Sequence, residues 1–132
     1  MANDFHPDTA ENIVDYISQG ADMPPAPSTV FVTLYDDEGN ELDGSLQNGR
    51  VSTSTPGDWT KTNTEFENDD EINFGEATED ITVQEVALKD DDETDGNTTV
   101  FVKGAINNAP EDFASGTEVL FEAGQLTFDV LD

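Results

Sequence analysis

The chain has 132 residues, and its 31 acidic side chains against four basic ones give a formal net charge of -27 at pH 7. Nucleic acids and anionic membrane surfaces are bound through Lys and Arg, so this charge excludes both as partners. Such a surface repels itself in dilute buffer, whereas molar salt shortens the screening length to about 3 Å. We therefore interpret the acidic residues as an adaptation to a salt-rich environment.

The apolar residues make up 34% of the chain and come in runs and alternations. This pattern favours one folded domain over an acidic disordered tail. Cysteine is absent, which excludes disulfides and thiolate metal sites. No apolar stretch is long enough to cross a bilayer, and the first residues lack a signal-peptide pattern, so we expect any export to use a route other than classical secretion.

A helix is predicted over residues 8–20. Asp8 is the expected N-cap, Glu11 stands at the capping-box position three residues later, and Gly20 is the expected stop. The proline-rich residues 23–27 then predict a short, stiff, extended connector.

One face of this predicted helix is apolar, with Ala10, Ile13, Val14 and Ile17 at helical spacing. The preferred interpretation is that this face packs on the chain's own sheet, because helices stabilised by packing usually pack locally. The alternative is that it reaches a neighbouring subunit, in which case Ile13, Val14 and Ile17 are assembly contacts.

From residue 28 onward the sequence predicts short strands. Residues 29–35 are β-branched and aromatic, and a turn cluster follows at 36–40. Further strands are predicted at 50–53, 71–74, 81–88, 98–103, 118–121 and 125–131. Many short strands at close spacing indicate a mainly β fold, an antiparallel β-sandwich with one short N-terminal α-helix. Residues 1–27 would form the arm, helix and connector, and residues 28–132 the β-sandwich domain.

No catalytic residue is assigned. His6 is the only histidine and lies before Pro7 in an expected N-terminal arm, whereas a catalytic triad or zinc site needs a rigidly held histidine. A pair of carboxylates at glycosidase spacing does not indicate a glycosidase here, because so acidic a chain contains such pairs by chance. Trp59 is also the only tryptophan that could stack on a sugar. We therefore expect no enzymatic activity and no cofactor.

The acidic run at 90–97 contains oxygen ligands of the kind that calcium prefers, with Asp90, Asp92 and Asp95 as candidates for weak cation binding. It lacks the distal glutamate of an EF-hand and falls where a hairpin loop is expected. A solvated loop is the preferred interpretation, and the same holds for 36–38 and 68–71, so no specific metal site is assigned.

Asn97 begins the only Asn-X-Ser/Thr sequon, at the tip of the same acidic run. It is a candidate glycosylation site only if the protein meets a glycosylation system.

Several stretches together resemble a family of small tailed-phage virion proteins, generally labelled phage tail-fibre-like proteins. The similarity spans about residues 13–131. It lies in the helix ending at Gly20, the strand at 28–35, Asn68, Ile72-Asn73-Phe74, Ala77-Thr78, the strand at 81–88, and the pair of strands around 119–126. The chain departs from the family pattern at Glu79-Asp80, where Trp-Gly is common, and at Gly49-Arg50-Val51, where aromatic residues are common.

Together with the acidic composition, the resemblance implies a structural virion protein of a tailed virus that infects halophilic archaea. We expect a homotrimer or homopentamer that assembles with other capsid or tail proteins. A capsid-surface decoration or turret is the first interpretation, because the chain is one small module without a fibre shaft. A tail-fibre or tail-tip protein that contacts the host surface is the second. A halophilic cell-surface binding module, including a calcium-dependent sugar-binding domain, is a third, and an enzyme comes last.

Overall fold

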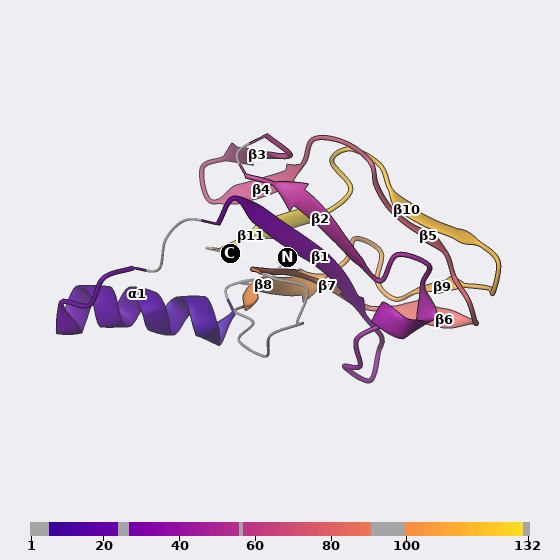
Figure 1. Ribbon diagram of the computed structural model, residues 1–132, viewed down its shortest axis with the longest axis horizontal. Coiled ribbons are helices and arrows are strands. Elements are labelled where there is room, and N and C mark those ends of the chain that lie inside the picture. Colours follow the sequence, from indigo (N-terminus) through magenta and orange to yellow (C-terminus); the bar gives the residue numbers. More distant parts are fainter. Residues whose placement is uncertain (1–5, 24–26, 56, 91–99, 131–132) are drawn as a thin grey trace.

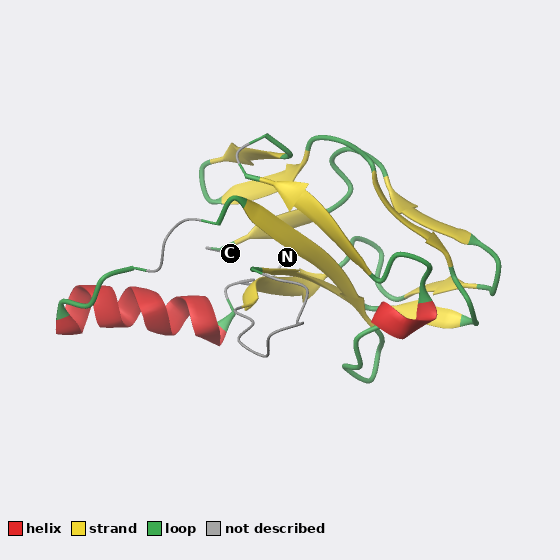
Figure 2. Ribbon diagram, viewed as in Figure 1, coloured by secondary structure: helices red, strands yellow, loops and turns green. Residues whose placement is uncertain are grey.

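The protein is described by a computed structural model that covers residues 6–23, 27–55, 57–90 and 100–130. Within these residues the fold is mainly β, with antiparallel sheets and one α-helix near the N-terminus (Figure 2), as the sequence predicted. The elements are α1 (Pro7–Gln19), β1 (Thr29–Tyr35), the short 3-10 helix η1 (Asp43–Ser45), β2 (Arg50–Ser54), β3 (Trp59–Thr62), β4 (Glu65–Asn68), β5 (Ile72–Glu76), β6 (Ile81–Val83), β7 (Glu85–Lys89), β8 (Val100–Ala105), β9 (Glu111–Phe113), β10 (Glu118–Phe121) and β11 (Thr127–Asp129).

The largest sheet has the strand order β2-β1-β7-β8, and three smaller sheets have the orders β11-β4-β3, β5-β10 and β6-β9. Every pairing is antiparallel. Figure 1 shows the strands gathered in one body, with α1 extending from one end of it.

Buried residues from all four sheets meet in one hydrophobic cluster. Val32 and Leu34 of β1, Phe74 of β5 and Phe128 of β11 are fully buried in it. The ring of Phe74 meets that of Phe121 edge-on at 6.1 Å between centroids, a geometry that aromatic pairs prefer. The four sheets therefore share one hydrophobic core.

The predicted strand at 81–88 is two strands. β6 pairs with β9, whereas β7 pairs with β1 and β8. Gln84 lies between them, and its backbone N–H donates to the Tyr35 carbonyl (2.9 Å) while its carbonyl accepts from Ile106 N–H (3.1 Å). The chain therefore passes from one sheet to another at Gln84. A shift in the apolar alternation between Val83 and Val86 marks the change.

The strand prediction missed three strands. β3, β4 and β9 carry polar or charged residues at most positions, and most of their side chains are exposed or half-buried. The apolar content of β3 and β4 is concentrated in Trp59 and Phe66, whose rings meet edge-on at 5.7 Å. Phe66 also stacks on Phe128 at 5.3 Å. Single aromatic anchors, rather than alternation, hold β3 and β4 to the core.

The helix begins one residue earlier than predicted, and its N-cap is different. His6 is the N-cap, its Nδ1 accepts from the backbone N–H of Asp8 (3.2 Å), and Pro7 occupies the first helical turn, where proline is favoured. The prediction of Asp8 as N-cap was therefore wrong. The predicted stop at Gly20 is confirmed, since this residue ends the helix in the left-handed conformation with φ 68°.

Candidate assembly surface

The first turn of α1 is held against β8, which is an edge strand of the largest sheet. The backbone N–H of Val100 donates to Asp8 Oδ2 (3.1 Å), and Thr9 Oγ1 donates to the Val100 carbonyl (3.2 Å). The backbone N–H of His6 donates to the Phe101 carbonyl (3.3 Å). His6, which was expected in an N-terminal arm, is thus part of this joint as the N-cap of α1. The joint covers part of an edge that would otherwise present unpaired backbone groups.

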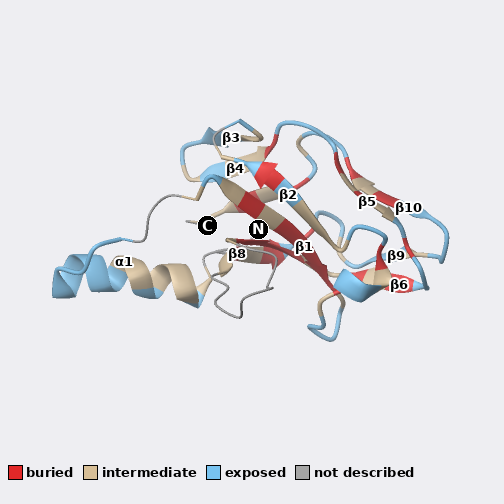
Figure 3. Cartoon of the chain, in the orientation of Figure 1, coloured by how far each residue is buried: buried red, intermediate tan, exposed pale blue. Residues whose placement is uncertain are grey.

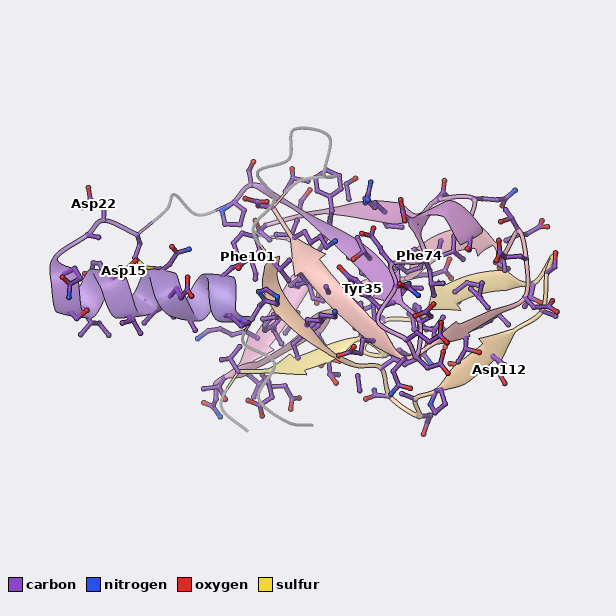
Figure 4. All side chains as sticks on the ribbon, turned by 90° about the horizontal axis from the view of Figure 1, so that it is seen from below. Asp15, Asp22, Tyr35, Phe74, Phe101 and Asp112 are labelled. Atoms are coloured by element: carbon purple, nitrogen blue, oxygen red, sulfur yellow. The ribbon has the colours of Figure 1, made fainter. Side chains whose placement is uncertain are left out.

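Beyond its first turns the helix leaves the β domain. Figure 4 shows Phe101 near the start of α1, and Asp15 and Asp22 far from the strands. No residue of α1 is buried, and every residue from Val14 to Gly20 is exposed. Figure 3 shows the same change from half-buried to exposed along the helix. The preferred interpretation, in which the apolar face packs on the chain's own sheet, therefore holds for Ala10 and Ile13, which are half-buried, and fails for Val14 and Ile17, which are exposed.

We call Ala10, Ile13, Val14 and Ile17 the α1 stripe. Ala10 and Ile13 are half-buried beside the joint, whereas Val14 is 59% and Ile17 75% exposed. Tyr16 and Met23 are also exposed. Among the described residues these four, Val14, Tyr16, Ile17 and Met23, are all the exposed large hydrophobic side chains. The described surface of the β domain therefore has no counterpart to the α1 stripe.

The charge of α1 is uniformly negative. Asp8, Glu11 and Asp15 lie on the helix, Asp22 follows it, and residues 7–23 contain no Lys or Arg. At the helical spacing of 100° per residue, the three helical carboxylates lie on the side away from the α1 stripe. The helix is thus amphipathic, with an apolar side for contact and an acidic side for solvent.

Three of the four basic residues make contacts inside the domain. Lys89 Nζ is 3.0 Å from Glu41 Oε1, and Arg50 Nε is 2.9 Å from Glu41 Oε2. Lys103 Nζ lies 3.9 Å from the centre of the Tyr35 ring, a cation–π contact. Lys61 alone of the four stands exposed, on β3. No described Asp or Glu is buried, so the outer surface is strongly negative, as predicted.

Most of the candidate cation site lies outside the described residues. Asp90 is half-buried at the end of β7, and Asp92, Asp95 and the candidate glycosylation site Asn97 lie outside the described residues. No described group of three or more His, Cys, Asp or Glu side chains could hold a metal ion.

In the acidic turn at 36–38, the carboxylate of Asp36 accepts hydrogen bonds from the backbone of the same turn. Asp36 Oδ1 accepts from the backbone N–H groups of Asn40 (2.8 Å) and Glu38 (2.9 Å). These donors, Asn40 first, hold the pKa of Asp36 below its ordinary value. This carboxylate is therefore part of the turn itself.

A hollow of about 420 Å³ lies between the turn after β8 and the strand β10, lined in part by Asn107, Asn108, Glu111 and Gln125. Glu111 is the one titratable side chain in its described lining, and no Ser, Cys, His or Lys stands beside it there. Asn107 Nδ2 already donates to the Gln125 carbonyl (3.1 Å). The exposed part of the α1 stripe, rather than this hollow, is the apolar surface that lacks a packing partner within the described part of the chain.

In the described part of the chain, no helix combines the length and the apolar character needed to cross a membrane.

The chain is thus a small β domain that presents one amphipathic helix beyond its edge. The model of the family described as Podophage GP4 fiber I protein gp80 matches residues 5–129. This match covers nearly the whole chain, so the protein belongs to that family of phage fibre proteins and is a virion component. The resemblance to a phage tail-fibre-like family is thereby confirmed at the level of the family. No curated protein matches the chain.

Proposed function

We propose that the protein is a non-enzymatic component of a fibre-type appendage on a tailed virus of halophilic archaea, and that it acts by assembly. The observation that carries the proposal is the α1 stripe, because the exposed large apolar side chains of the described chain gather on and beside one helix that leaves the domain. Exposed apolar patches of this kind mark contact surfaces. Ile13, Val14 and Ile17 are the assembly contacts in this proposal.

The halophilic setting is supported by the charge distribution. A net charge of -27 with no described acidic residue buried gives a surface that molar salt would screen and stabilise. Virion appendages are symmetric, so we further propose a homotrimer or homopentamer. The end of the appendage that points away from the particle would contact the host surface.

A capsid-surface decoration or turret is the second candidate. The observation that favours it is the compact β domain with a single core, which contains no shaft within the described residues. The family of fibre proteins favours the appendage.

The test is mass spectrometry of purified virions, followed by separation of heads from tails. The appendage proposal predicts the protein in virions and in the tail or neck fraction. Recovery with tail-less heads would favour the capsid candidate, and absence from virions would overturn both.

A further inference from the structure

The α1 stripe is an unpartnered helix face, and three observations decide which kind of partner it fits. They are the lack of an equally exposed apolar counterpart on the described β domain, the small area of a helix pair, and the charge of the chain. The inference rests on the proposed function, since it names the partner of the same contact surface.

On the described part of a second copy, the large hydrophobic side chains that are exposed lie on α1 or just after it, whereas those at the surface of the β domain, such as Phe101, Phe113 and Leu120, are only partly exposed. The most exposed apolar surface that a second copy offers the α1 stripe is therefore its own helix. Two copies would then meet through this face as a helix pair or small bundle.

Such a helix pair would be small. The 13 residues of α1 span only about 20 Å at 1.5 Å per residue. The α1 stripe has four side chains, two of them half-buried in the isolated chain. A specific interface usually buries about 800 Å² on each partner, which one face of so short a helix does not supply. A groove that encloses the helix on several sides uses more of its surface.

The charge of α1 also gives a helix pair no ion pair between the two copies. Each helix carries Asp8, Glu11 and Asp15 without a cation, on a chain of net charge -27. Arg50, Lys89 and Lys103 make contacts within their own domain, which leaves Lys61 on β3 as the exposed cation of a second copy. Lys or Arg at the lips of a foreign groove would complement the acidic flank of the helix.

We propose that α1 inserts into a groove on a different polypeptide of the virion, with an apolar floor for Ile13, Val14 and Ile17 and with Lys or Arg at its lips. The spacing of Ala10, Ile13, Val14 and Ile17 is the i, i+3, i+4, i+7 pattern of helix-in-groove recognition. The joint between the first turn of α1 and β8 sets the direction in which the helix leaves the domain. Oligomerisation of the protein then uses surfaces other than α1.

The test exploits the absence of cysteine from the chain. The full-length variant V14C is labelled with a maleimide benzophenone, incorporated into virions and photolysed, and D15C is the matched control on the acidic side of the same helix. The proposal predicts that the V14C label crosslinks to another virion polypeptide, at an apolar segment flanked by Lys or Arg, at least several-fold more than the D15C label.

Three results would overturn the inference. They are a crosslink to a second copy of the chain, a crosslink to a foreign segment flanked by acidic residues, and a yield from V14C no higher than that from D15C. If the variants and the wild-type chain are all absent from virions, the proposed function itself fails, and mass spectrometry of the same particles distinguishes this case.

Discussion

The side chain of Asn68 joins segments of the fold that are far apart in the sequence. Its Nδ2 donates to the carbonyls of Asp70 (2.8 Å) and Glu122 (3.1 Å), and its Oδ1 accepts from the backbone N–H of Leu126 (3.0 Å). It is only 2% exposed. One amide thus satisfies backbone groups of the turn between β10 and β11, which carries the C-terminal strand back to β4.

Substitution N68A is expected to lower the free energy of unfolding by about 2–4 kcal/mol, because it leaves buried backbone donors and acceptors without partners. Chemical denaturation in molar KCl measures the change. N107A is the matched control, because Asn107 is exposed and makes one hydrogen bond, to the Gln125 carbonyl, and it should cost about 1 kcal/mol or less. Equal losses in the two variants would contradict the role assigned to Asn68.

The apolar side chains of α1 and those of the core strands are expected to contribute differently to the free energy of unfolding. Substitutions V14S and I17S together should change the free energy of unfolding by less than about 0.5 kcal/mol, because both side chains are exposed. F74A should cost about 3–5 kcal/mol, because Phe74 is fully buried against Phe121. Denaturation curves of the three proteins make the comparison.

Light scattering of the V14S/I17S variant adds a second readout. The oligomeric state in molar KCl should equal that of the wild-type protein, because self-association is assigned to other surfaces. Dissociation of the variant, or a loss of stability comparable to that of F74A, would show that α1 packs within the protein.

The elements that the sequence predicted well are those in which apolar alternation dominates. The prediction for β1 had the observed limits, because Val30, Val32 and Leu34 alternate and point into one core. The polar strands β3, β4 and β9 were missed because their positions are set by partner strands and by single aromatic anchors rather than by their own pattern. The amino-acid composition of a segment does not indicate which strand or aromatic side chain it will pack against.

The candidate assembly surface was partly predictable for a similar reason. The helical spacing of Ile13, Val14 and Ile17 identified an apolar face, but spacing is the same whether the face packs inside the chain or outside it. The N-cap of the helix could not be identified from the sequence for the same reason. Asp8 fits the capping pattern, but its carboxylate accepts from Val100 N–H across the joint. Only the tertiary arrangement distinguishes these cases.

At the scale of the whole molecule, net charge should control stability. Raising KCl from 0.1 to 2 M is expected to stabilise the protein by about 2 kcal/mol, or roughly 5–10 °C in Tm, because screening removes repulsion between exposed carboxylates. Scanning calorimetry at several KCl concentrations measures the change of Tm with salt. A Tm that stays constant or falls over this range would contradict the interpretation of the acidic surface.

A charge-reduced variant is the control for the salt experiment. D37N, E71Q, E79Q and E111Q together replace four exposed carboxylates by amides of similar shape. This variant should be more stable than the wild-type protein at 0.1 M KCl and should show a smaller rise with salt. An unchanged slope would indicate that salt acts through something other than these charges.

In the proposed arrangement, the protein is a virion appendage component attached through α1. Cryo-electron microscopy of the intact virion tests it most directly, because the β domain and the helix can be placed in one map. We expect the β domain on the outside of the particle, with α1 enclosed by a different virion polypeptide along Ile13, Val14 and Ile17. A map in which α1 stands free in solvent, or packs only against copies of itself, would contradict it.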